Sequence, residues 1–144
     1  MAKTALTASK VPNTTRWLTP EEGLAAHDAA AALLAAVLRG TPAEARGDHG
    51  QPTDAEGFAA MRCDEVLVHG YDIARGLGVA FTSPQDLARH VRDPLFPWPP
   101  TGGPWTTLLW CNGRMALPDH ARLTDWSRHP APLSEWDGTR RRER

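Results

Sequence analysis

The chain has 144 residues, a formal net charge of −1 at pH 7 and a hydrophobic fraction of 41%. This length fits one domain that can bury an ordinary core, and the hydrophobic fraction is too high for a disordered chain. The near-neutral charge argues against a general affinity for nucleic acid or for an anionic membrane surface.

The two ends of the chain show no pattern typical of a compact fold. Residues 1–17 have no periodicity and are predicted to be a loose leader, and residues 139–144 are a basic tail that we expect to be solvated. The leader lacks the apolar h-region of a signal peptide, and no apolar run reaches the roughly 18 residues of a membrane span. We therefore expect a cytoplasmic protein without a membrane partner, with a single helical domain over residues 18–138.

A first helix is predicted to begin at Pro20. Thr19 can cap it, proline suits the first helical position, and Glu22 has the spacing of a capping box. Gly40 is expected to end the helix. Its apolar residues repeat at helical spacing: Leu24, Ala31, Leu34 and Leu38. The helix is rich in alanine, so another helix can approach it closely.

A second helix is predicted over residues 53–78. Thr53 and Glu56 have the spacing of another capping box, and Gly78 suits the end of the helix. Cys63 and Cys111 are the two cysteines of the chain, and neither belongs to a C-x-x-C pair. We expect no disulfide framework and no thiolate zinc site, and Cys63 is interpreted as a small buried hydrophobe.

The rest of the chain predicts two shorter helices and an irregular end. Ser83 and Pro84 suit the start of a third helix that Pro94 ends or kinks, and residues 105–113 have the pattern of a fourth. Residues 117–138 are broken by prolines and are expected to lie extended across the helices. With no convincing strand pair, the fold class is all-α, a partial helical bundle followed by an irregular C-terminal region rich in proline and tryptophan.

One narrow polar line runs along the second helix. On a helical wheel Glu65, His69 and Asp72 share one direction, and most other directions at the helix centre are apolar. A helix that is apolar on most sides is expected to be buried, and a buried ionised glutamate is costly unless it is paired or bound to a metal. Residues four apart on a helix are neighbours, so Glu65 and His69 can share one divalent ion.

Two further residues suit supporting roles at such a site. Asp72 can accept the second ring N–H of His69, and Arg62 can pair with Glu65 or with an anionic substrate. The competing interpretation is a Glu65–His69–Asp72 hydrogen-bond network without a metal. Spacing alone leaves both interpretations open.

The sequence around this line resembles the mycothiol-dependent maleylpyruvate isomerase family, whose fold is a DinB-like four-helix bundle. The resemblance spans roughly residues 20–137 and includes the family's Glu-x-x-x-His motif, here Glu65 and His69 with Asp72 following. It also includes these downstream segments: residues 104–110, 113–114 and 123–126.

The resemblance implies a divalent metal, usually zinc, bound by Glu65, His69 and a histidine from an earlier helix. It further implies that the thiol cofactor mycothiol binds at the open metal position and is deprotonated there. In the isomerase that thiolate adds to a conjugated double bond of a small organic acid, so that the bond can rotate.

The resemblance also implies two bundle helices before the alanine-rich helix, the second of which carries the first metal histidine. Only about 18 residues precede that helix here, and they contain no histidine. We therefore expect a chain that lacks the first two bundle helices and has an incomplete metal site. His27 is one candidate third ligand, although a core or interface histidine is the alternative, and a second copy of the chain is another source. His49 lies about 22 Å from His69 along the helix axis, too far for the same ion.

Three functional hypotheses follow. The first is a zinc-dependent thiol transferase or isomerase that uses mycothiol and a small organic acid. The second is a non-catalytic helical remnant or association module, and the third is a helical domain without metal. The remaining aromatic and basic candidates are expected to be packing anchors (Trp105, Trp110 and Trp126) and surface residues (Arg114 and Arg122).

Overall fold

The computed structural model describes residues 18–140, and the predicted leader over residues 1–17 lies outside them, as does most of the basic tail. The described elements are α1 (Pro20–Gly40), β1 (Gly47–Asp48), β2 (Pro52–Thr53), α2 (Ala55–Gly76), α3 (Gln85–Leu95), α4 (Pro104–Cys111) and a 3-10 turn, η1 (Leu133–Glu135). The predicted all-α class is confirmed. The chain divides into two compact units between Leu33 and Leu34, so the division falls within α1.

The capping box predicted for α1 is present. The hydroxyl of Thr19 accepts from the backbone N–H of Glu22 at 3.2 Å, and the Glu22 carboxylate accepts from the backbone N–H of Thr19 at 3.0 Å. Each residue thereby satisfies a donor that has no partner within the helix. None of the residues of α1 is buried.

By length and mean hydropathy, α1 is apolar enough to span a membrane, contrary to the expectation that no segment would be. A single helix of this kind is weak evidence for a span. Asp28 lies near its middle, where an ionised carboxylate in a bilayer costs roughly 3 kcal/mol.

The loop between α1 and α2 holds a minimal antiparallel hairpin that the sequence did not predict. Gly47 pairs with Thr53 and Asp48 with Pro52. Gly50 lies in the turn with a φ of 76°, a conformation that glycine adopts without strain. Two residues per strand are too few for any alternation of polar and apolar positions to appear in the sequence.

The N-terminus of α2 is capped by a residue other than the predicted one. Asp54 accepts a hydrogen bond from the backbone N–H of Gly57 at 2.7 Å. Thr53 belongs to β2 instead, and its hydroxyl donates to the carbonyl of Gln51. The predicted capping box of Thr53 and Glu56 is therefore wrong, although the helix itself is confirmed two residues shorter at each end.

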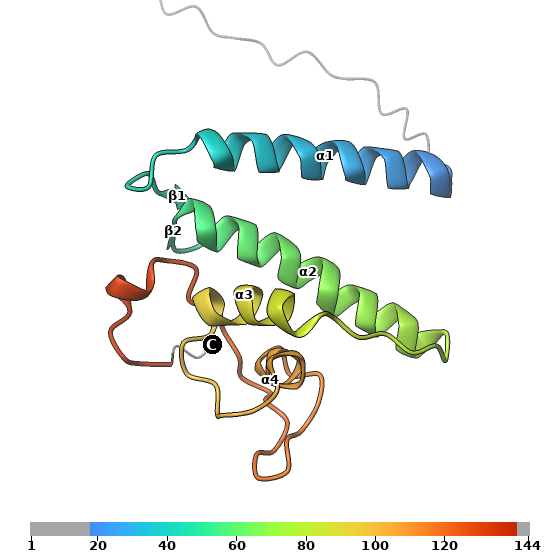
Figure 1. The fold of residues 1–144 in the computed structure, drawn as a ribbon, viewed down its shortest axis with the longest axis vertical. Coiled ribbons are helices and arrows are strands. Elements are labelled where there is room, and N and C mark those ends of the chain that lie inside the picture. The colour runs from blue at the N-terminus through green and yellow to red at the C-terminus, as the bar shows by residue number, and fades with distance from the viewer. Residues whose placement is uncertain (1–17, 141–144) are drawn as a thin grey trace, which may run out of the picture. The chain divides into compact units, whose positions relative to one another are not determined.

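The core of the second unit forms where α2, α3 and α4 meet. Figure 1 shows α3 beside α2 and α4 against α3, and contacts join both pairs of helices. Pro94 lies in the last turn of α3, which ends at Leu95 as predicted. Trp105 and Trp110 are buried in the core and Trp126 is half-buried against it, so the prediction that they are packing anchors is confirmed.

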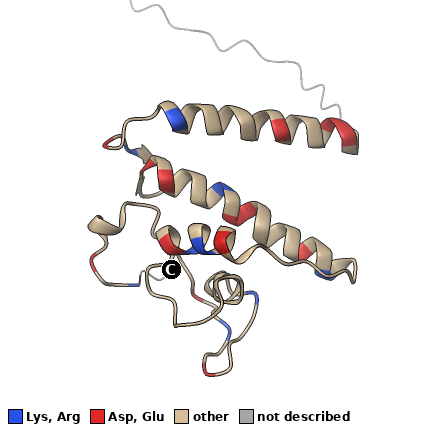
Figure 2. Cartoon of the chain, in the orientation of Figure 1, with Lys and Arg blue, Asp and Glu red and all other residues tan. Residues whose placement is uncertain are grey.

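Charged residues of both signs are interspersed along α2 and α3 (Figure 2). This distribution agrees with the net charge of −1. Neither α2 nor α3 carries a continuous stripe of basic residues alone or of acidic residues alone.

Candidate functional site

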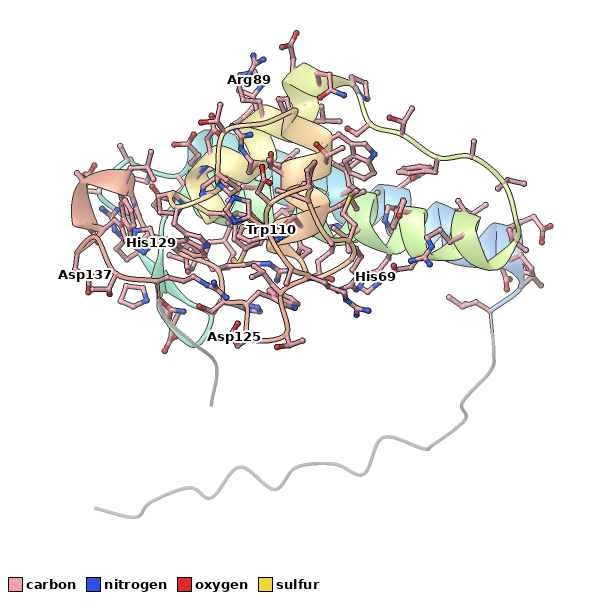
Figure 3. All side chains as sticks on the ribbon, turned by 90° about the horizontal axis from the view of Figure 1, so that it is seen from below. His69, Arg89, Trp110, Asp125, His129 and Asp137 are labelled. Carbon is pink, nitrogen blue, oxygen red and sulfur yellow. The ribbon has the colours of Figure 1, made fainter. Side chains whose placement is uncertain are left out.

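The structure brings Glu65 and His69 together on α2. The Nε2 atom of His69 lies 2.9 Å from the Oε2 atom of Glu65, across one helical turn. Both side chains reach solvent, with exposed fractions of 60% for His69 and 41% for Glu65. His69 is marked on α2 in Figure 3.

The prediction that this pair is buried is wrong. α2 buries one face in the core, and Cys63, Val66 and Ile73 on another face are exposed, although the Phe81 ring packs against Gly70 between them. Apolar character did not require burial here, because folded proteins also leave many apolar side chains exposed. The expectation that Cys63 is buried fails for the same reason. Burial therefore gives no physical argument for a metal at Glu65.

Among the described residues, the fully buried carboxylate is Asp64, which the sequence did not single out. Its Oδ2 accepts from Nε of Arg128 at 3.0 Å, and its Oδ1 accepts from Nδ2 of Asn112 at 2.8 Å. Burial raises the pKa of Asp64 to about 6, against the opposing effects of Arg128 and Asn112. Asp64 is therefore the residue whose buried negative charge is energetically unfavourable. The cation that offsets this desolvation energy is the guanidinium of Arg128 and not a metal.

Arg128 joins the buried and the exposed carboxylates. Its Nη2 donates to Oε1 of Glu65 at 2.7 Å, and its guanidinium lies 5.3 Å from the centre of the Trp126 ring. Partial burial tends to raise the pKa of Glu65, but Arg128 and His69 outweigh it and lower that pKa. Glu65 is therefore ionised at neutral pH, with Oε1 held by Arg128 and Oε2 facing His69.

Asp72 has a different partner from the expected one. Its Oδ2 accepts from Nη2 of Arg114 at 2.9 Å, whereas Nδ1 of His69 lies 3.9 Å away, beyond hydrogen-bond distance. The expectation that Asp72 orients the ring of His69 through a hydrogen bond is not met. Arg114 is correspondingly half-buried rather than a free surface residue, and Arg122 is exposed as expected.

Arg62 lies at the edge of a cavity next to Glu65. The cavity has a volume of about 240 Å³ and is lined by Leu34, His49, Phe58, Met61, Arg62, Glu65 and Arg128. The loop before α2 brings His49 to the same cavity as Glu65, which its distance along the helix axis did not predict.

No third metal ligand accompanies the pair in the part of the chain that the structure describes. Within residues 18–140, no three side chains of histidine, cysteine, aspartate or glutamate are grouped so that they hold a metal ion. His27 belongs to the first unit, where its Nδ1 lies 3.5 Å from Oδ1 of Asp28. His120 contacts the ring of Trp110, and His129 lies 3.4 Å from the carbonyl of Pro132.

A family model for the mycothiol maleylpyruvate isomerase N-terminal domain matches residues 2–74, about half of the chain. The chain belongs to this family. The match covers α1, the hairpin and nearly all of α2, including the Glu65–His69 pair. No curated protein and no solved structure matches the chain. The downstream likeness over residues 104–126 lies outside the match and stays a prediction.

Proposed function

We propose that Glu65 and His69 are two ligands of a divalent cation, with zinc as the preferred ion. The observation that carries this proposal is the 2.9 Å approach of His69 Nε2 and Glu65 Oε2 on an exposed face of α2, in a chain of this family. One imidazole nitrogen and one carboxylate oxygen belong to the donor set that zinc prefers. The two residues supply half of the donors of a tetrahedral site, and no third histidine, cysteine, aspartate or glutamate is grouped with them within residues 18–140.

The surroundings of Glu65 suit this role. Ligation requires the ionised carboxylate, and the low pKa of Glu65 keeps that form at neutral pH. The hydrogen bond from Arg128 fixes Oε1 and leaves Oε2 directed at His69. Arg128 would therefore act as a positioning residue for the ligand oxygen.

Membership of the family supports mycothiol as the thiol cofactor and a small organic acid as the substrate class. A divalent ion lowers the pKa of a coordinated thiol and so supplies a nucleophilic thiolate. The cavity beside Glu65 carries Arg62, Arg128 and His49, which suit the carboxylate of such an acid. Thiol transfer or isomerisation in the cytoplasm is the activity that this arrangement supports.

The first test is zinc retention by the purified chain. His69→Ala is expected to lose bound zinc, because it removes one of the two donors, and metal analysis after dialysis measures the loss. His90→Ala is the matched control, since His90 is an exposed histidine on α3. Equal zinc retention by the two variants would contradict the proposal, as would a wild-type chain that binds no zinc.

An association module without catalysis is the second candidate function. The observations that favour it are the absence of a buried residue in α1 and of a third ligand within residues 18–140. Turnover of a small unsaturated organic acid by the zinc-loaded chain with mycothiol separates the two functions.

A further inference from the structure

A second cavity, which the proposed function does not use, lies beside the C-terminal turns of α1. It has a volume of about 350 Å³, and we call it the apolar cavity. Its wall comes from the second unit alone, from the end of α1, the loop with the hairpin and the start of α2. The apolar side chains in this wall are those of Leu34, Val37, Leu38, Ala45, Ala55 and Phe58. This volume is at the lower end of the range of roughly 300–1,000 Å³ for pockets that bind small molecules.

The polar side chains in the wall of the apolar cavity are already bound within the fold. The hydroxyls of Thr41 and Thr53 each donate to a backbone carbonyl. Asp54 caps α2, and Nη2 of Arg46 forms an ion pair with Glu135 at 2.7 Å. Because these groups already have partners, a polar ligand group gains little there, and the apolar cavity favours a hydrocarbon group.

Phe58 and Leu34 lie between the apolar cavity and the cavity next to Glu65. Both residues belong to the walls of both cavities, which are therefore neighbours. The hairpin region holds the Phe58 ring in this place. A Cβ on Gly47 would lie 2.7 Å from that ring, and the ring of His49 meets it edge-on with centroids 6.4 Å apart. The two cavities together can hold the two ends of one ligand.

The cavity next to Glu65 differs from the apolar cavity in its charged residues. Its wall carries the guanidinium groups of Arg62 and Arg128, the imidazole of His49 and the carboxylate of Glu65. Both oxygens of Glu65 are already engaged, by Nη2 of Arg128 and by Nε2 of His69. Two guanidinium groups beside one engaged carboxylate favour a ligand carboxylate over a ligand amine.

We propose that this chain binds an acid with a hydrocarbon tail, with the carboxylate in the cavity next to Glu65 and the tail in the apolar cavity. The inference deepens the proposed function and rests on it only in taking a carboxylic acid as the substrate class. It specifies that the acid carries a hydrocarbon group that lies beyond Phe58, which a short and fully polar acid lacks. This binding needs no metal, so it can be measured without zinc.

Calorimetric titration of the zinc-free full chain with straight-chain acids tests the proposal. Butanoate, hexanoate and octanoate differ only in tail length, and each added methylene should tighten binding by roughly fourfold while the apolar cavity fills. Octanol and octylamine have the tail without the carboxylate and should bind more weakly than octanoate by roughly tenfold or more. Equal affinities for butanoate and octanoate would overturn the proposal, as would octanol or octylamine binding as tightly as octanoate.

Ala45→Phe tests where the tail lies. The added ring fills part of the apolar cavity, so octanoate should bind roughly tenfold more weakly while butanoate is unaffected. Ala43→Phe is the matched control, since Ala43 is an exposed alanine of the same loop outside the wall of the cavity. Circular dichroism checks that both variants keep their helices. Equal octanoate affinities of the two variants would exclude the apolar cavity as the place of the tail.

Arg62→Gln tests where the carboxylate lies. Octanoate should bind roughly tenfold more weakly to this variant, and octanol should bind as it does to wild type. Arg75→Gln is the matched control, since Arg75 is an exposed arginine of α2 outside the walls of both cavities. Equal octanoate affinities of the two variants would overturn the assigned place of the carboxylate.

The two proposals fail in different ways. A wild-type chain that does not bind octanoate would overturn this inference, and zinc retention through His69 would be unaffected. A chain that binds octanoate and retains no zinc would overturn the proposed metal ligands and leave the two cavities as a binding site for the acid.

Discussion

At the scale of single residues, neighbours on α2 have opposite environments. Asp64 is fully buried and Glu65 is 41% exposed, yet one guanidinium, that of Arg128, binds both carboxylates. Burial raises the pKa of Asp64, while the pKa of Glu65 is lowered. The two groups therefore make opposite contributions to the pH dependence of stability.

Asp64 is expected to make the folded chain less stable as pH rises from about 4 to about 6. Its pKa is about 6 in the folded state against 3.8 when unfolded, so the folded state binds the extra proton in this window. Above pH 6 the cost is constant, at about 3 kcal/mol. Asp64→Asn removes this titration, and denaturant unfolding from pH 4 to 7 measures the difference. The contribution of Glu65 persists in both proteins, and parallel pH profiles would contradict the prediction.

At the scale of elements, the N-cap of α2 is Asp54, a residue that the capping-box motif of the sequence did not indicate. Asp54 accepts from the backbone N–H of Gly57, and the hairpin holds Thr53 in β2. The cap and the hairpin together fix where α2 begins.

Asp54→Ala should destabilise the chain by about 1 kcal/mol, because a first-turn N–H loses its acceptor. Chemical unfolding at pH 7 measures the change. Glu56→Gln is the informative comparison, since a capping box through Glu56 would make that residue important. The expected effect of Glu56→Gln is below about 0.5 kcal/mol, and a larger loss there than in Asp54→Ala would contradict the assigned cap.

Local patterns in the sequence predicted where the helices lie, but not which residues contact them or which of their faces are buried. The Thr19–Glu22 box and the start of α1 at Pro20 depend on residues three apart, and both are confirmed. The partner of Asp64 lies 64 residues away in a segment with no regular structure, so no periodicity indicated it. The helical wheel predicts a buried second helix, but Val66 and Ile73 are exposed, because the wheel shows apolar character and not which faces have a neighbour.

At the scale of the molecule, the irregular segment after α4 joins the second unit together. In this segment, Arg114 forms an ion pair with Asp72, and Arg128 forms ion pairs with Asp64 and Glu65. The segment therefore contacts α2 at several points. The carbonyl of Pro130 approaches Gly57 so closely that a Cβ there would clash with it. A segment that the sequence presents as proline-broken coil thus positions the charged residues of α2.

Arg128→Met should be the most damaging substitution of a charged residue in this segment, with a loss of about 3 kcal/mol in the free energy of unfolding. The loss arises because Asp64 stays buried without its cation, while Asn112 supplies only one hydrogen bond. Arg140→Met is the control, since its pair with Asp125 is more exposed and is worth less than about 1 kcal/mol. Combining Arg128→Met with Asp64→Asn should recover much of the loss, because no buried charge then remains without a partner. Equal unfolding midpoints for the Arg128 and Arg140 variants would show that Arg128 does not offset the charge of Asp64.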